Sequence, residues 1–317
     1  MDAFGNGQRM MSFPNTSLRA AALPLVAIVF LFATLFGFAH AESTTPGARI
    51  ADIEPIAALR EQHLAMRERL ANNGFKRPLV LESFHSSQDV KGDIYAVVPD
   101  AFDIFGEALA KPQAWCDILI LHLNTKYCRV SAEKQPTSLV MNVGNKFEQP
   151  LKDSFRLVFS WNVAKNNADY LRIMLSADAG PLGTHDYRIT LEAIPLKSGG
   201  TFVHLSYSYG YGLTGRLAML AYFNTAGRAK VGFTVVGLDA DGKTTYVDGI
   251  RGVAERNTMR YYLAIESYLG ALRLPPGVQF EKRINDWFAA TERYPRQLRE
   301  VKQREYLAMK RNEYQRQ

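Results

Sequence analysis

The stretches FRLVFSWNV (residues 155–163), LRIMLSAD (171–178), YRITLEA (187–193) and LSYSY (205–209) decide the fold. In each of them hydrophobic and polar residues alternate, which is the pattern of a β-strand with one buried and one solvated face. The segments between them, KNN (165–167), GPLG (180–183) and KSGG (197–200), have the composition of tight turns. The alternation therefore predicts an antiparallel meander with one dry face.

The segments on either side of the meander add a hairpin, short helices and one long helix. Strands are predicted at Pro78–Phe84 and Asp93–Val98, and two short helices over residues 99–120, interrupted at Lys111-Pro112. A second hairpin is predicted at 229–236 and 243–248, followed by a helix from about Val253 to Leu272. One face of that helix is apolar and aromatic, so we expect it to cover the dry face of the sheet.

The N-terminus has the order of a secretory signal. Arg9 and Arg19 precede an apolar run from Ala20 to Phe38, which Ala39-His40-Ala41 closes. We therefore predict a signal peptide at residues 1–41 and an exported protein, periplasmic or secreted. The run is also long enough for an uncleaved anchor, which is the alternative. Both interpretations place the bulk of the chain outside, because the positive charges precede the run.

Two further segments flank the predicted domain. Residues 42–77 are interpreted as a tether and an amphipathic N-terminal helix, which we expect to pack on the domain; pairing with another helix is the alternative. Residues 273–317 form a basic C-terminal helical extension, with ten basic against six acidic residues between Glu281 and Gln317. We interpret it as a solvated surface helix; contact with an anionic membrane surface is the alternative. Although the chain has a net charge of +7, export argues against a nucleic-acid partner.

The two cysteines, Cys116 and Cys128, lie in the exported part of the chain. An oxidising compartment favours a disulfide between them. His122 lies midway, but two thiols and one imidazole fall short of a four-ligand metal site, so no metal is expected. His122 and His185 lie near predicted strand ends, where we expect them to be solvated.

Over about residues 78–272 the order of elements resembles the helix-grip fold of START lipid-transfer domains and polyketide cyclase-like (SRPBCC) proteins. Gly92–Val98 is similar to the opening strand of that fold and Gly200–Val203 to a late strand. The resemblance implies an α+β domain in which a curved antiparallel sheet grips a long C-terminal helix. The N-terminal helix, an insertion near residues 212–229 and the C-terminal extension depart from the simple pattern.

In such a fold an apolar cavity lies between sheet and helix. The resemblance therefore implies a binding or carrier protein for a hydrophobic small molecule or lipid, with no cofactor. The inward positions that match are Phe159, Trp161, Ile173, Tyr187, Leu205, Tyr207, Tyr209, Tyr262 and Ile265. Plain core packing is the alternative for each of them. The apolar segment 213–226 is either a core helix or a lid over the cavity.

Catalytic motifs are weak in this sequence. The segment GYGLTG (210–215) matches a dinucleotide fingerprint, but the preceding strand alternates, whereas a central parallel strand would be continuously apolar. His204 and Glu192 share one strand face and form a candidate acid–base pair, although we assign that face to solvent. Two alternatives to a carrier stay open: a cyclase- or hydrolase-like enzyme that uses pocket tyrosines or a histidine, and an envelope interaction protein whose terminal helices dock a partner.

Overall fold

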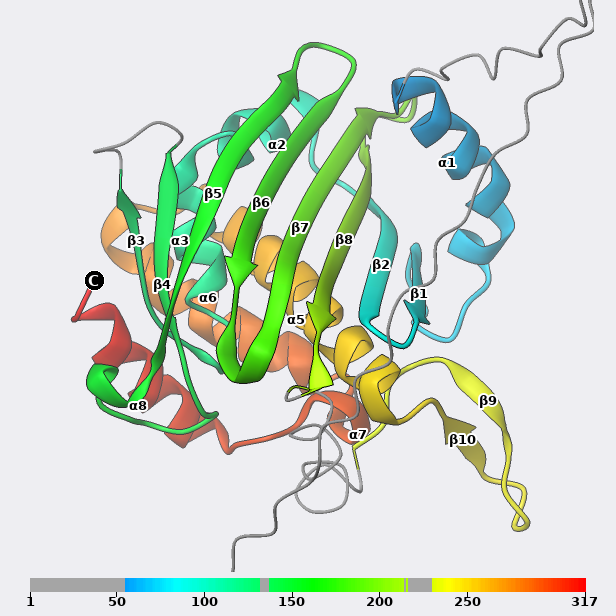
Figure 1. Ribbon diagram of the computed structural model, residues 1–317. Coiled ribbons are helices and arrows are strands. Elements are labelled where there is room, and N and C mark those ends of the chain that lie inside the picture. Colours follow the sequence, from blue (N-terminus) through cyan, green and yellow to red (C-terminus); the bar gives the residue numbers. More distant parts are fainter. Residues whose placement is uncertain (1–54, 132–136, 214, 216–229) are drawn as a thin grey trace, which may run out of the picture. The chain divides into compact units, whose positions relative to one another are not determined.

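Eight strands form one antiparallel sheet in the computed structural model, which describes residues 55–131, 137–213, 215 and 230–317 (Figure 1). The strand order is β1-β2-β8-β7-β6-β5-β4-β3. The strands are β1 (Leu79–His85), β2 (Asp89–Val98), β3 (Thr125–Ser131), β4 (Ser138–Val143), β5 (Phe155–Asn166), β6 (Leu171–Ala179), β7 (Thr184–Pro195) and β8 (Thr201–Tyr211). Strands β3 to β8 pair in sequence order, so the predicted meander is confirmed.

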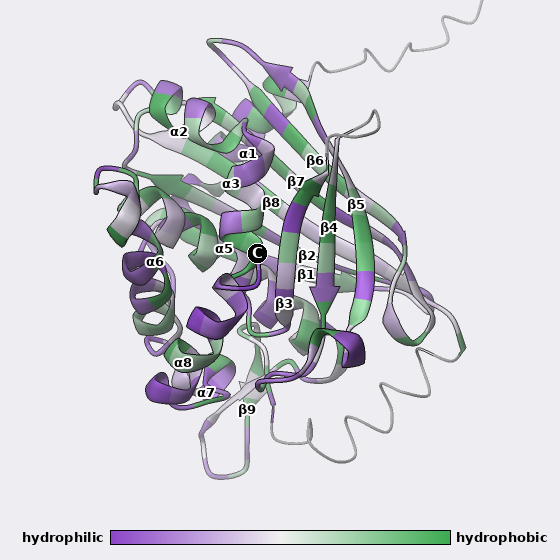
Figure 2. Ribbon diagram, turned by 90° about the vertical axis from the view of Figure 1, so that its left-hand side faces the viewer, coloured by the Kyte–Doolittle hydropathy of each residue, from purple (hydrophilic) through white to green (hydrophobic). Residues whose placement is uncertain are grey.

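The long helix α5 (Gly249–Ala271) crosses one face of this sheet and contacts β1, β2 and β8 (Figure 1). At Gly92 of β2 the helix approaches the sheet closely, since a Cβ atom there would overlap the Thr258 hydroxyl. Figure 2 shows α5 and the later helices α6 and α8 together on this side of the sheet. The chain thus has the helix-grip fold, an α+β arrangement of a curved antiparallel sheet and a long helix.

Short elements complete the domain. Helices α2 (Phe102–Leu109) and α3 (Pro112–Leu119) join β2 to β3 as predicted, and Pro112 occupies the first turn of α3. Two 3-10 turns lie at Leu151–Asp153 and Pro181–Gly183. The second hairpin pairs β9 (Val235–Leu238) with β10 (Thr244–Tyr246). Its first strand begins later than predicted because the preceding amides, those of Phe233 and Thr234, donate to the Glu255 carboxylate.

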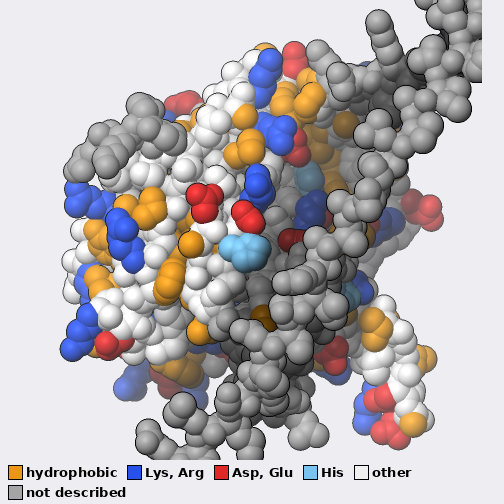
Figure 3. Space-filling model, in the orientation of Figure 1, with side chains coloured by type: hydrophobic (Ala, Val, Ile, Leu, Met, Phe, Trp, Pro, Cys, Tyr) orange, Lys and Arg blue, Asp and Glu red, His pale blue; other side chains and the backbone are white. Residues whose placement is uncertain are grey.

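Helix α1 (Pro55–Ala71) packs on the opposite face of the sheet from α5. Its Leu59, Met66 and Leu70 form a second apolar cluster with outward residues of the sheet, among them Tyr95 and Phe202. The prediction that this face is solvated is therefore wrong beneath α1, because the helix supplies an apolar stripe that covers it. Figure 3 shows basic, acidic and hydrophobic side chains interspersed on the same face.

The C-terminal segment forms α6 (Pro276–Thr291), α7 (Pro295–Leu298) and α8 (Gln303–Tyr314). Trp287, Tyr306 and Met309 are buried in the main core, and the Tyr306 hydroxyl donates to the Leu121 carbonyl at 2.9 Å. The interpretation of this segment as a solvated surface helix is wrong, because large apolar residues are spaced among its charges. The described residues from 55 to 317 belong to one compact unit.

Two lysines, Lys310 of α8 and Lys126 of β3, are buried in ion pairs. The Glu313 carboxylate accepts from Lys126 at 3.0 Å and from Lys310 at 2.7 Å, and all three side chains are fully buried. Each ammonium also donates to backbone carbonyls, Lys310 to those of His122 and Thr125. Burial of such charges is tolerated only when they are paired and hydrogen-bonded, so α8 is part of the folded domain.

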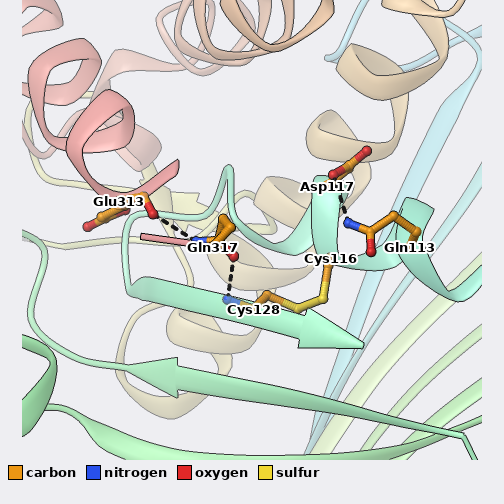
Figure 4. Close-up of a disulfide and its surroundings, with 6 residues drawn as sticks. All are labelled: Gln113, Cys116, Asp117, Cys128, Glu313 and Gln317. Atoms are coloured by element: carbon orange, nitrogen blue, oxygen red, sulfur yellow. Dashed lines mark hydrogen bonds between the residues drawn. A yellow bond between two sulfur atoms is a disulfide. The ribbon is translucent and has the colours of Figure 1, made fainter. Parts of the chain in front are cut away.

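Cys116 of α3 and Cys128 of β3 form a disulfide, as the sequence predicted (Figure 4). The Gln317 side chain lies beside it: its carbonyl oxygen accepts from the Cys128 amide at 2.9 Å, and its amide donates to the Glu313 carbonyl oxygen at 2.8 Å. Within the described ranges, no helix combines the length and the hydropathy that a membrane span needs. Residues 1–41 lie outside those ranges, so the signal peptide, the alternative anchor and export stay predictions.

Candidate ligand-binding cavity

A cavity of about 340 Å³ lies between the sheet and α5. Strands β7 and β8 form one wall and α5 forms the other, with the loops after α3 and β4 and the β6–β7 turn at the ends. This volume is at the small end of the range of small-molecule sites, about 300 to 1,000 Å³. The lining residues are Asn124, Lys146, Pro181, Leu182, Thr184, Tyr187, Tyr207, Tyr209, Gly215, Val253, Arg256, Asn257 and Arg260.

Three tyrosines form the sheet wall. Alternation along β8 directs Tyr207 and Tyr209 inward, and Tyr187 of β7 stacks on Tyr209 with ring centroids 5.2 Å apart. Tyr207 also lies 5.3 Å from the ring of Tyr261 on α5. Burial raises the pKa of all three lining phenols, although a hydrogen bond with Asn257 opposes the rise at Tyr207. They are therefore neutral and present apolar ring faces with hydroxyl groups at their tips.

The opposite side of the cavity is cationic. Arg256 and Arg260 come from successive turns of α5, and Lys146 comes from the loop between β4 and β5. The Glu300 carboxylate lies behind this lining and accepts from Lys146 at 2.8 Å and from Arg260 at 3.0 Å. Burial alone would raise the pKa of Glu300, but these cations lower it to about 2. Glu300 is therefore ionised at all ordinary pH values.

His122 is buried next to the cavity, with 3 % of its surface exposed. Its Nδ1 accepts from the backbone amide of the cavity residue Asn124 at 3.2 Å, and its ring stacks on Tyr261. Burial, together with the charges of Arg260 and Lys310, holds the pKa of His122 well below its usual value, although a hydrogen bond with Asn257 opposes the fall, so the ring is neutral. The prediction that His122 is solvated is wrong, because α5 and the C-terminal helices cover the loop that carries it.

Of the nine predicted ligand residues, the structure brings Tyr187, Tyr207 and Tyr209 together in the cavity lining. The other six do not line it. Phe159 packs edge-on against Tyr187, and Tyr262 turns its hydroxyl toward Glu266 and Arg77 at the β1 side of the helix. All six are buried or partly buried in the main core: Phe159, Trp161, Ile173, Leu205, Tyr262 and Ile265. These six lie farther along the sheet and helix, where side chains fill the interface.

Sequence reasoning missed several polar residues of the cavity, among them Lys146, Arg256, Asn257 and Arg260. A signal for the helix residues was present, because Val253, Arg256, Asn257 and Arg260 follow the spacing of one helix face. Polar residues at that spacing normally indicate the solvated face of an amphipathic helix. Lys146 belongs to a loop, and no periodicity could have placed it.

The predicted pair of His204 and Glu192 is formed, but on the other side of the sheet. His204 Nδ1 lies 3.2 Å from Glu192 and its Nε2 lies 2.8 Å from Asp93, and the ring stacks on Tyr95. The side chains of His204 and Glu192 are only 15 % and 17 % exposed, so their assignment to solvent is wrong. Positions 204 and 207 face opposite ways on a strand, which separates this pair from the tyrosines of the cavity.

Two other sequence signals fall on this part of the chain. The GYGLTG segment begins within the end of β8, which pairs antiparallel with both β2 and β7, so the parallel strand that a dinucleotide fingerprint requires is not present there. The proposed lid at 213–226 lies almost wholly outside the described residues.

Within the described ranges, no group of three or more His, Cys, Asp or Glu side chains is arranged to hold a metal ion.

No family model matches this chain, and no curated protein matches it by sequence. Among solved structures, norcoclaurine synthase from Thalictrum flavum is similar at 14% identity and a TM-score of 0.31, over 47% of this chain and 80% of that one. The Zhui aromatase/cyclase from a Streptomyces species has 14% identity and a TM-score of 0.31, over 65% and 94%. Human StAR-related lipid transfer protein 5 has 11% identity and a TM-score of 0.28, over 53% and 87%. These are distant similarities, so the fold assignment rests on the strand order and on the position of α5.

Proposed function

We propose that this protein binds a small hydrophobic molecule in the cavity between β7, β8 and α5. The supporting observation is the cavity of about 340 Å³ beside three tyrosine rings, at a place where side chains do not fill the space between sheet and helix. Ring faces supply apolar contact and the neutral hydroxyls supply hydrogen bonds, which is the combination that orients a small apolar ligand. Binding and carriage require no covalent step.

The cavity supports binding better than catalysis. The tyrosines have raised pKa values and remain protonated, and His122 already uses its Nδ1 lone pair to accept from Asn124. The strongest acid–base arrangement, His204 with Asp93 and Glu192, lies on the other face of the sheet. A general base must reach the proton that it removes, and this trio does not reach the cavity.

The proposal includes export through residues 1–41. The Cys116–Cys128 disulfide supports it, because disulfides persist in oxidising compartments. N-terminal sequencing of the protein purified from its native cells tests this directly: a mature chain that begins at Glu42 is expected, and an intact N-terminus recovered with membranes would instead support the anchor.

Contact of residues 273–317 with an anionic membrane surface is retained only as a secondary proposal. Among the described ion pairs, six of the ten basic side chains between Glu281 and Gln317 are joined to carboxylates of the protein. That pairing leaves less positive charge for a lipid surface.

Filling the cavity tests the proposed function. Val253 is half-buried and lines the cavity, so Val253→Trp should occupy the ligand space. We expect fluorescence titration with the neutral dye N-phenyl-1-naphthylamine to show binding by the wild type and an affinity at least about tenfold weaker in this variant, a loss of about 1.4 kcal/mol. The control Val278→Trp makes the same exchange at an exposed position of α6 and should bind normally. Equal binding by wild type and Val253→Trp would place the dye elsewhere and reject the proposal.

A further inference from the structure

The cavity has two walls of different chemistry. The β7 and β8 wall presents tyrosine rings, whereas Arg256 and Arg260 of α5 and Lys146 of the β4–β5 loop give the other side positive charge. No carboxylate belongs to the lining within the described residues. Glu300, behind the lining, forms ion pairs with Lys146, Lys230 and Arg260.

A buried hydrogen-bond donor adjoins the same wall. His122 is neutral and its Nδ1 accepts from the Asn124 amide, so its proton is on Nε2. The ring is almost wholly buried, and a hydrogen bond with the Asn257 side chain opposes the fall in its pKa. His122 is not among the described residues that line the cavity, so it supports the wall from behind. The positive charge of this side of the cavity therefore comes from Arg256, Arg260 and Lys146, which line it.

We infer that the ligand is a compact amphiphile with an anionic group, such as a carboxylate, sulfonate or phosphate, attached to an apolar body. The anionic group lies against Arg256, Arg260 and Lys146, and the apolar body lies against Tyr187, Tyr207 and Tyr209. Hydrogen bonds between cations and anions are about twice as strong as neutral ones, and the buried position reduces their screening by water. The cavity volume favours a molecule of one compact ring system or short chain over a two-chain lipid. This inference rests on the proposed function, since it describes the ligand of the same cavity.

Two dyes with one ring system separate the anionic contribution from the apolar one. 8-Anilino-1-naphthalenesulfonate carries a sulfonate, and N-phenyl-1-naphthylamine is its neutral counterpart. In fluorescence titrations, Arg256→Gln should weaken binding of the sulfonate about tenfold, as expected for the loss of one charge-assisted hydrogen bond. The same substitution should change the affinity for the neutral dye less than about twofold. Lys146→Gln removes a second, only partly buried cation and should act in the same direction.

A matched control and the contrary outcomes complete the test. Lys243→Gln removes one positive charge from the β9–β10 hairpin, where the side chain is 74 % exposed, and should leave both affinities unchanged. Thermal unfolding of each variant checks that the fold is intact. If Arg256→Gln unfolds, Lys146→Gln decides the result. Equal effects on both dyes, or none on either, would reject the anionic site while hydrophobic binding still stands. Failure of the wild type to bind either dye would overturn the proposed function itself.

Discussion

The sequence assigns His204 to a solvated face, but its side chain lies between the carboxylates of Asp93 and Glu192. Burial alone would lower the pKa of His204, but hydrogen bonds to Asp93 and Glu192 raise it above the usual value. The Asp93 carboxylate also pairs with Lys91 at 3.0 Å, and Glu192 accepts from the Tyr170 hydroxyl and lies 3.9 Å from Arg172. The imidazolium therefore joins two carboxylates on the face of the sheet opposite α5.

This arrangement predicts a pH dependence of stability. Because the folded-state pKa of His204 is raised, its stabilising contribution is complete below the unfolded value of about 6.5 and is lost as the pH rises through the folded value. We expect His204→Gln to lower the free energy of unfolding by about 1 to 3 kcal/mol near pH 6, where two buried carboxylates lose their shared partner. Urea unfolding over a pH series should show the difference between wild type and variant shrinking toward alkaline pH.

The exposed histidine His85 supplies the control, since His85→Gln removes an imidazole that has no role in this cluster. A difference between wild type and His204→Gln that stays constant with pH would show that packing, not charge, accounts for the effect.

The candidate site could be predicted only in part from the sequence, because alternation reveals the face of a strand but not what covers it. Tyr207 and Tyr209 were assigned to the inner face correctly, and so was the shared face of His204 and Glu192. The position of α1 over that second face depends on the path of the chain after the helix, which no local pattern contains. The cationic wall was missed because Arg256 and Arg260 on a helix normally face solvent.

At the scale of elements, the crossing of α5 over β2 depends on Gly92. The backbone of β2 approaches α5 so closely there that only hydrogen fits beside the β-branched Thr258. The Thr258 hydroxyl donates to the Ala254 carbonyl at 2.8 Å, which holds this side chain in place.

Gly92→Ala should therefore destabilise the protein by about 1 to 3 kcal/mol, the usual result of overpacking a core. The midpoint of chemical unfolding measures the change. Gly74→Ala is the control, because a Cβ at Gly74 would meet no atom within 4 Å. If both variants unfold at the wild-type midpoint, helix and sheet are not in contact at Gly92.

Most elements of the domain followed from periodicity, and the exceptions have a physical cause. The meander was predictable because a half-buried strand must alternate, and α5 because its apolar stripe continues for several turns. The burial of α8 was not predictable from composition, since its sequence is rich in charge. Only the folded chain shows that Glu313 forms buried ion pairs with both Lys310 and Lys126.

For the whole molecule, α8 closes one end of the core. Tyr306 is fully buried, stacks on Trp287 and bonds the Leu121 carbonyl, so it joins α8 to α6 and to the loop after α3. Tyr306→Ala should cost about 3 to 5 kcal/mol, as for other large aromatic residues removed from cores. Tyr306→Phe should cost only about 1 kcal/mol, because it removes the hydroxyl and keeps the ring.

Thermal or urea unfolding distinguishes these two variants. A deletion of residues 278–317 would, on the same reasoning, fail to leave a folded domain, contrary to what a docking-only extension requires. A cooperative transition at the wild-type midpoint for Tyr306→Ala would show that α8 does not contribute to the core.

The sheet is open, with β1 and β3 at its edges. At β3 the Cys128 amide is occupied by the Gln317 side chain, which also bonds α8. An edge strand with free amides invites pairing with the edge of a neighbouring molecule. Helix α8 and the residues after it thus also protect the edge strand β3 from pairing with other molecules. Chains that lose α8 are expected to self-associate and precipitate as well as unfold.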